Sequence, residues 1–161
     1  MTNIKKKISH ISEKNLPRMV DVSKKLKTER LASSEARVHL GKELTAFLKE
    51  SKHTKKGPVI QTAVIAGIQG AKKTSDLIPM CHPLILDGVE IDIKLEDEYA
   101  IINATIKTKD RTGVEMESLT AVSTAALTIY DMCKSINKGI TIESIRLLEK
   151  KGGKSGHYFK K

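Results

Sequence analysis

The stretch VEIDIKLEDEYAIINATI (Val89–Ile106) decides the fold, because it consists of two alternating segments joined by a polar turn. Apolar residues occupy every other position from Val89 to Leu95, with charged residues between them, and the alternation resumes from Ala100 to Ile106. Side chains point alternately to the two faces of a strand, so each segment can bury one face and expose the other. The sequence therefore predicts a β-hairpin with one face on a core.

A helix is predicted directly after the hairpin, over Thr112–Lys134. Its apolar residues recur at steps of three and four, the spacing of a core-facing stripe. They are Leu119, Val122, Ala126, Ile129, Cys133 and Ile136. The first residues, Thr112–Glu115, fit a capping box, in which the Glu115 carboxylate helps to close the first turn. Glu115 therefore has a structural explanation, and the sequence does not separate it from a functional one.

Three charged residues of the same helix lie away from the stripe: Glu117, Asp131 and Lys134. At about 100° per residue they fall close together in angle. An acid and an amine three residues apart form a surface ion pair worth about 0.2–0.5 kcal/mol. They can also act as a general acid and a general base on a rigid element. The pattern alone leaves both interpretations open.

Five further segments flank this hairpin and helix. We expect a strand at residues 34–40, a helix at residues 41–50 and a basic loop at residues 51–58. A second helix is expected at residues 59–73, and a last strand at residues 141–148. The order β-α-α-β-β-α-β predicts an α+β fold of ferredoxin-like type, an antiparallel sheet with helices packed on one face. We expect a single domain over residues 18–156, a disordered basic tail over residues 1–17 and a C-terminal tail over residues 157–161.

The helix expected over residues 59–73 has two kinds of face. Its predicted buried side consists of Val64, Ile65, Ile68 and Ala71. Its small residues are Ala63, Ala66, Gly67 and Gly70. These would allow close backbone packing against a neighbour.

The formal net charge of +10 is the strongest signal in the composition. Basic proteins meet phosphate groups, in nucleic acids, at membrane surfaces or in nucleotides. Aromatic residues make up only 3% of the chain, too few for the stacking surfaces of single-strand binders. No apolar run approaches the length of a membrane span, about 18 residues. From the few aromatic residues and the lack of a long apolar run, we expect a protein that binds neither nucleic acid nor membrane. Cys81 and Cys133 show no paired spacing, so we expect reduced thiols in a cytoplasmic protein.

Two prolines enclose Cys81 and His82 in LIPMCHPL (Leu77–Leu84). A rigid loop can present side chains to a pocket, so His82 can bind a substrate and Cys81 can act as a nucleophile. A loop histidine and a buried thiol are equally open explanations. A Cys and a His that adjoin in sequence, without further ligands nearby, are poorly spaced for a tetrahedral metal site. We therefore expect no metal there.

Two basic glycine-containing loops are candidate phosphate sites. KKGGKSG (Lys150–Gly156) is not a Walker A loop, because Leu148 stands where that loop needs glycine and only a short tail follows. Its lysines can still hold phosphate, or they belong to a solvated tail. Lys55–Gly57 is likewise either a mobile lysine loop over a site or a surface charge run.

Five blocks of this sequence belong together: MVDVS (Met19–Ser23), KKG (Lys55–Gly57), Ile65–Leu84, Thr112–Lys134 and RLLEKKGGKSG (Arg146–Gly156). They closely resemble the MoaC family, the cyclic pyranopterin monophosphate synthases of molybdenum-cofactor biosynthesis. The resemblance implies a lyase that converts 3′,8-cyclo-7,8-dihydroguanosine 5′-triphosphate to cyclic pyranopterin monophosphate and releases diphosphate. It implies no protein-bound metal or organic cofactor. It also implies a homo-oligomer, a hexamer arranged as a trimer of dimers, with sites shared between subunits and with the small residues of Ala63–Gly70 as a packing surface.

The resemblance also implies roles for individual residues. Asp131 matches a catalytic acid/base, and Lys134 and Lys56 match catalytic lysines. The residues at substrate-binding positions are Met80, Cys81, His82, Glu115, Met116 and Glu117, and those at phosphate-binding positions are Lys150 and Arg30. Family members often have an acidic residue where this chain has Pro58, a difference in the loop that carries Lys56. The proton transfers would suit groups whose pKa values are moved toward neutrality by burial and neighbours.

Two other functions remain open from the sequence. The charge of +10 is compatible with a non-enzymatic nucleic-acid-binding module. Against that function, Glu117 and Asp131 are carboxylates that would repel phosphates. The second possibility is a catalytically inactive scaffold of the same family.

Overall fold

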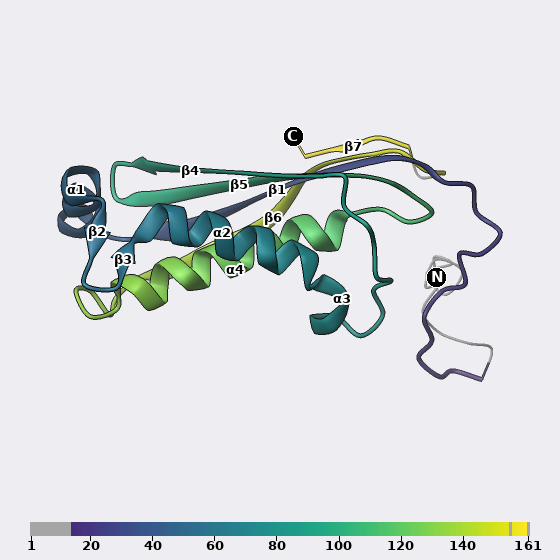
Figure 1. Cartoon of the computed structure of the whole chain (residues 1–161), viewed down its shortest axis with the longest axis horizontal. Coiled ribbons are helices and arrows are strands. Elements are labelled where there is room, and N and C mark those ends of the chain that lie inside the picture. The colour runs from purple at the N-terminus through teal and green to yellow at the C-terminus, as the bar shows by residue number, and fades with distance from the viewer. Residues whose placement is uncertain (1–13, 155, 161) are drawn as a thin grey trace, which may run out of the picture.

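A five-stranded antiparallel sheet forms one layer of the molecule, and α2 and α4 cover one of its faces (Figure 1). The computed structural model describes residues 14–154 and 156–160. The strands lie in the order β4-β5-β1-β6-β7, and they are β1 (Thr28–His39), β4 (Gly88–Glu96), β5 (Tyr99–Asp110), β6 (Thr141–Lys151) and β7 (Tyr158–Phe159). The helices are α1 (Lys42–Ser51), α2 (Val59–Lys72), α3 (Thr74–Leu77) and α4 (Glu115–Cys133). A separate small hairpin pairs β2 (His53–Thr54) with β3 (Gly57–Pro58).

The predicted α+β fold of ferredoxin-like type is confirmed. The β4-β5 hairpin has the expected register, from Gly88 opposite Lys107 to Glu96 opposite Tyr99. Alternate residues of β5 are fully buried because β5 is an inner strand with two helices on one face: Ala100, Ile102, Ala104 and Ile106. β1 lies between β5 and β6 and is antiparallel to both. Such an order requires the helical connections that the sequence predicted between the strands.

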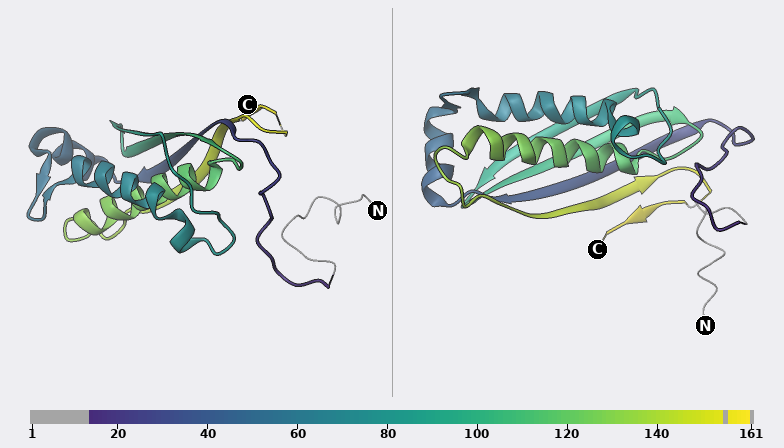
Figure 2. Two further views of the ribbon diagram at one scale, coloured as in Figure 1. Left: turned by 45° about the vertical axis from the view of Figure 1, so that its right-hand side comes forward. Right: turned by 90° about the horizontal axis from the view of Figure 1, so that it is seen from below.

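Helices α2 and α4 lie side by side on the sheet (Figure 2). Their contact uses the small residues of α2, because Gly67 and Gly70 sit against the backbone of α4. A Cβ at Gly67 would lie 3.0 Å from the Ala121 carbonyl oxygen, and one at Gly70 would lie 2.8 Å from Thr124 Cβ. The predicted close packing of this face is therefore confirmed, and its partner is α4 of the same chain.

The predicted buried side of α2 is wrong for most of its residues. Ala71 is buried, but Val64 and Ile68 are only half-buried, and Ile65 is 68% exposed. The buried positions are instead Val59, Ala63, Gly67, Gly70 and Ala71. Close approach of the two backbones places the glycines and alanines in the contact, so the larger side chains lie beside it or face outward.

The apolar stripe of α4 is confirmed over most of its length. Val122, Ala126, Ile129 and Cys133 are completely buried, whereas Leu119 is half-buried. The helix ends at Cys133, so Ile136 lies in the following turn and is 51% exposed.

Three short elements were not predicted: the β2-β3 hairpin within the basic loop, α3 and β7. The two residues of β7 pair with Glu149 and Lys150 at the sheet edge, within the segment that we expected to be a C-terminal tail. Of the N-terminal tail expected over residues 1–17, residues 1–13 lie outside the described part of the chain. The domain boundaries stay a prediction. None of the described helices is both long enough and apolar enough to cross a membrane.

Candidate active site

Asp131, Lys134 and Lys56 meet at the C-terminal end of α4. Lys134 Nζ lies 2.7 Å from Asp131 Oδ1, across one helical turn. Lys56 Nζ donates to Asp131 Oδ2 and to the Asp131 carbonyl oxygen, each at 2.7 Å. Lys56 reaches α4 from the turn between β2 and β3. The structure thus brings together the three residues expected to be catalytic, which we call the lysine–aspartate cluster.

Ionisation in the lysine–aspartate cluster differs from the expectation. Hydrogen bonds from Lys134 and Lys56 lower the pKa of Asp131 to about 2. The hydrogen bond to Asp131 raises the pKa of Lys134. All three side chains are about half exposed, so pairing dominates over burial. The pKa values of Asp131 and Lys134 thus move away from neutrality, and the Asp131 carboxylate lies between the amino groups of Lys134 and Lys56.

Pro58 does not prevent Lys56 from reaching Asp131. Pro58 belongs to β3 and precedes α2 with φ −72°, a value that the proline ring favours. Its carbonyl accepts a hydrogen bond from Thr62 in the first turn of α2. Gly57 supplies the φ of +111° that lets the hairpin turn into this position.

A second group of predicted residues surrounds a cavity of about 330 Å³ at the N-terminal end of α4. Its walls are the segment before β4, the start of α4 and residues near the N-terminus. The lining includes all six expected substrate-binding residues: Met80, Cys81, His82, Glu115, Met116 and Glu117. We call it the carboxylate cavity, because two glutamates face it.

Glu117 is the unusual group of the carboxylate cavity. Its side chain is 4% exposed, and Oε2 has no hydrogen-bond partner among the described residues. Burial, and to a lesser extent the nearby Glu115 charge, raises the pKa of Glu117 to about 7. Burial, followed by the charge of Glu117, also raises the pKa of the Cys81 thiol. Cys81 is therefore a neutral thiol at pH 7, which disfavours the nucleophile interpretation.

A basic cavity of about 820 Å³ adjoins the carboxylate cavity and shares part of its wall, including Lys25 and Glu115. Six cationic side chains line it: Lys24, Lys25, Arg30, Arg111, Lys150 and Lys154. Arg30 Nε and Nη2 each donate to a backbone carbonyl at 3.3 Å, those of Asp110 and Arg111. The predicted phosphate-binding residues Lys150 and Arg30 thus share one cavity that suits a polyanion.

The capping box expected at the start of α4 is not formed. Val114 occupies the cap position, and no side chain caps the helix. Glu115 Oε1 instead lies 3.0 Å from Lys150 Nζ, with both side chains largely buried. Glu115 turns toward the basic cavity because a cation from β6 is available there.

Sequence reasoning missed Lys24, Lys25 and Arg111 as members of the basic cavity. Lys24 and Lys25 directly follow the block Met19–Ser23, and Arg111 directly precedes Thr112–Lys134. The available signal was a basic residue directly beside each of these two blocks.

The predicted site residues form two groups in one chain. Glu117 and Asp131 are fourteen residues apart on the same helix, and at 1.5 Å per residue this is about 21 Å. The lysine–aspartate cluster and the carboxylate cavity of one chain therefore lie near opposite ends of α4.

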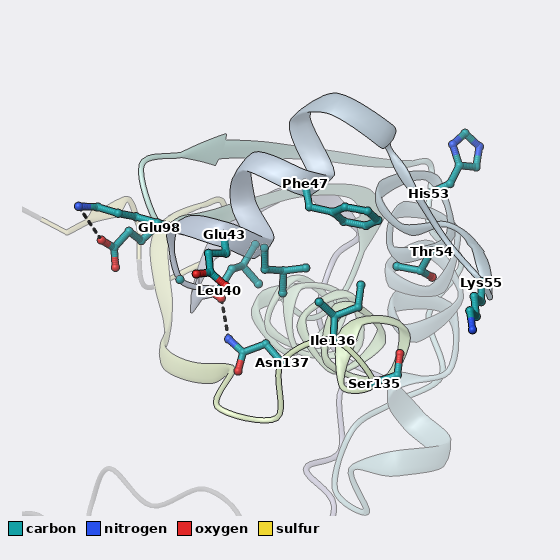
Figure 3. Close-up of a pocket in the computed structure, with 13 residues that line it drawn as sticks. Leu40, Glu43, Phe47, His53, Thr54, Lys55, Glu98, Ser135, Ile136 and Asn137 are labelled. Atoms are coloured by element: carbon teal, nitrogen blue, oxygen red, sulfur yellow. Dashed lines mark hydrogen bonds and ion pairs between the residues drawn. The ribbon is translucent and has the colours of Figure 1, made fainter.

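A further cavity of about 1010 Å³, larger than the carboxylate cavity and the basic cavity, is lined by none of the predicted site residues. It lies between α1, the β2-β3 hairpin and residues 135–137 (Figure 3). Lys55 lines it, whereas the neighbouring Lys56 points to Asp131. Asn137 closes one side by donating to the Leu40 carbonyl at 2.9 Å. Cavity size therefore does not locate the site in this protein. Within the described residues, no group of three or more His, Cys, Asp or Glu side chains is placed to hold a metal ion.

The chain thus combines a ferredoxin-like α+β fold with a lysine–aspartate cluster at one end of α4 and a cavity lined by cationic side chains at the other. The profile described as MoaC family matches residues 19–153, and the chain belongs to this family. It is 53% identical over 154 residues to the cyclic pyranopterin monophosphate synthase of Helicobacter pylori, covering 94% of this chain and 96% of the relative. It is 49% identical over 150 residues to the protein of that name from Peptoclostridium acidaminophilum, covering 93% and 95%.

Proposed function

We propose that this protein is a cyclic pyranopterin monophosphate synthase of molybdenum-cofactor biosynthesis. It is a lyase that converts 3′,8-cyclo-7,8-dihydroguanosine 5′-triphosphate to cyclic pyranopterin monophosphate and releases diphosphate. The observation that carries this proposal is the near-full-length identity, about half of all residues, to proteins that bear this name.

The cavities at the N-terminal end of α4 are suited to bind the substrate. The triphosphate occupies the basic cavity, where Arg30 and Lys150 neutralise part of its charge. The purine-derived rings occupy the carboxylate cavity beside His82. Glu117 exchanges protons readily there, because its pKa of about 7 lies near the working pH.

The lysine–aspartate cluster supplies and accepts protons. A ribose hydroxyl attacks the α-phosphate, its proton passes to a base, and the bond to the β-phosphate breaks so that diphosphate leaves with the electron pair. Lys56 and Lys134 donate protons or stabilise the charge of the leaving group. Asp131 holds both amino groups in place through contacts of 2.7 Å, and it raises the pKa of Lys134.

Activity on the cyclised nucleotide tests the function. We expect the wild type to release diphosphate, and Asp131→Asn or Lys134→Ala to abolish the release while the protein stays folded by circular dichroism. Lys49→Ala is the matched control, since Lys49 is an exposed lysine on α1 and lies outside both groups. If either the Asp131 or the Lys134 variant kept wild-type turnover, the catalytic role proposed for that residue would be wrong. Salt-sensitive binding to random RNA without any turnover would support a nucleic-acid-binding module instead.

We infer that the active enzyme is a homo-oligomer, a hexamer of three dimers, in which each site takes the lysine–aspartate cluster from one subunit and both cavities from another. The separation of about 21 Å along α4 supports this arrangement. The exposed apolar residues Ile65 and Leu127, 68% and 61% exposed, offer surface for a second copy on the helical layer. Light scattering would test for six subunits. The cytoplasmic location expected from the cysteines stays a prediction that cell fractionation can check.

Subunit mixing tests the shared site. Lys134→Ala and Lys150→Ala are each expected to be inactive. After joint unfolding and refolding, their mixture is expected to regain about a quarter of wild-type activity, because half of the dimers are mixed and each of these has one intact site. A mixture of Lys134→Ala with Lys56→Ala is the control and is expected to stay inactive, since every site then lacks a lysine of the cluster. Failure of the first mixture, or recovery in the second, would contradict the shared site.

A further inference from the structure

The chain turns sharply after β6 at Gly152 and Gly153. Both glycines have left-handed backbone conformations, with φ of +95° and +74°, which other residues adopt only with strain. The turn packs on the beginning of β1, because a Cβ on Gly152 would overlap the Glu29 carbonyl oxygen. Gly153 packs on the next residue of β1, Arg30.

Gly153 lies directly against the guanidinium of Arg30. A Cβ on Gly153 would overlap Arg30 Nη1 and would lie 2.8 Å from Cζ and 3.3 Å from Nη2. These distances are shorter than van der Waals contacts permit, so either the turn or the guanidinium would have to move.

Arg30 has little freedom to move away. Its Nε and Nη2 each donate to a backbone carbonyl at 3.3 Å, those of Asp110 and Arg111 at the end of β5. The guanidinium is thus held by β5 on one side and adjoins Gly153 on the other. Displacing it would break the two hydrogen bonds that orient it.

Arg30 and Gly153 both line the basic cavity. The guanidinium occupies the space that a side chain at residue 153 would take, with Nη1, the nitrogen of Arg30 that makes neither of those two bonds, directly against the glycine. A methyl group at residue 153 would displace the guanidinium from the position in which it lines the basic cavity.

We propose that Gly153 is a positioning residue for substrate binding: its lack of a side chain lets Arg30 keep the orientation in which its guanidinium lines the basic cavity and can bind a phosphate group. The identity of the phosphate-bearing ligand rests on the proposed function. Gly153 has no side chain to react, and it acts through Arg30.

Gly156 provides a matched control in the same loop. It also has a left-handed conformation, with φ of +67°, but a Cβ there would meet nothing within 4 Å. Alanine at either position therefore causes comparable backbone strain, and only alanine at 153 meets Arg30. The difference between Gly153→Ala and Gly156→Ala isolates the contact with Arg30.

The test measures steady-state kinetics with the cyclised nucleotide, inorganic diphosphate binding by calorimetry, and thermal unfolding. We expect Gly153→Ala to raise KM and weaken diphosphate binding by about tenfold, the scale of a lost charged hydrogen bond, with a smaller change in kcat. Gly156→Ala is expected to stay within about twofold of wild type in both. Both variants are expected to stay folded at the assay temperature, with the lower unfolding temperature for Gly153→Ala because this change also disturbs the hydrogen bonds of Arg30.

A double variant shows whether the effect passes through Arg30. In an Arg30→Ala background the overlap is gone, so Gly153→Ala is expected to add less than about twofold to the loss. An equal loss in both backgrounds, or equal behaviour of the two glycine variants, would overturn the inference. A wild-type protein without turnover and without diphosphate binding would instead refute the proposed function.

Discussion

Lys56 Nζ lies 2.7 Å from Asp131 Oδ2, although 75 positions separate the two residues in the chain. The contact joins the β2-β3 turn to the end of α4 and brings a second ammonium group to a carboxylate that already pairs with Lys134. Neither residue is buried, so the contact positions charge more than it stabilises the fold.

Replacing Lys56 by Met is expected to raise the pKa of Asp131 from about 2. The value should stay below that of an ordinary aspartate, because the hydrogen bond from Lys134 is the larger cause of the shift. A carboxyl ¹³C NMR titration of both proteins measures this change. An unchanged pKa would mean that Lys56 does not contact Asp131 in solution.

Glu117→Gln is expected to stabilise the protein more at pH 8 than at pH 5. The folded-state pKa of Glu117 is raised from 4.5 to about 7, so the wild type loses stability as the pH rises through this interval and ionisation becomes costly in the fold. Glutamine removes that loss, which is at most about 3 kcal/mol.

Urea unfolding at the two pH values checks the prediction for Glu117. Wild type and variant should differ little below pH 5 and diverge toward pH 8. A difference that does not depend on pH would show that Glu117 titrates normally.

Gly70→Ala is expected to destabilise the protein by about 1–3 kcal/mol. The added Cβ would lie 2.8 Å from Thr124 Cβ and 3.2 Å from the Thr120 carbonyl oxygen, so the two helices would have to separate. Gly88→Ala is the control, because its nearest neighbour, Lys107 Cβ, is 3.9 Å away. Thermal unfolding of both variants measures the difference, and equal melting temperatures would contradict the close contact of α2 with α4.

Iodoacetamide is expected to label Cys81 before Cys133. Cys133 is fully buried, and burial raises the pKa of its thiol to about 11. Cys81 is half-buried with a smaller increase in pKa. Mass spectrometry of the labelled protein in buffer and in urea checks the order. Labelling of Cys133 at the same rate in both would show that α4 opens in the native state.

The local sequence patterns predict the sheet well, because burial on one face leaves a period of two in β5 from Ala100 to Ile106. They fail for α2, where Ile65 and Ile68 look like a core stripe. Which face of a helix is buried depends on how closely its neighbour approaches, and Gly67 and Gly70 permit an approach that hydrophobic periodicity does not report.

The residues proposed to be catalytic can be picked out from the family blocks, but their arrangement cannot. Asp131 and Lys134 are only three positions apart in the sequence. Lys56 reaches them from a hairpin whose strands have two residues each, too short to show a hydrophobic periodicity. The Glu115–Lys150 contact replaces a capping box that fits the sequence equally well. Choosing between them requires knowing that the end of β6 passes the start of α4.

Helix α4 also sets a length requirement on the enzyme. Its nineteen residues hold the two functional groups apart at a fixed spacing and a fixed rotation. One inserted residue would move Asp131 by about 1.5 Å and turn it by about 100° relative to Glu117. Substitutions along the buried stripe preserve this geometry, whereas insertions and deletions do not. The spacing of the two groups therefore depends on the number of residues in the middle of α4 more than on which amino acids they are.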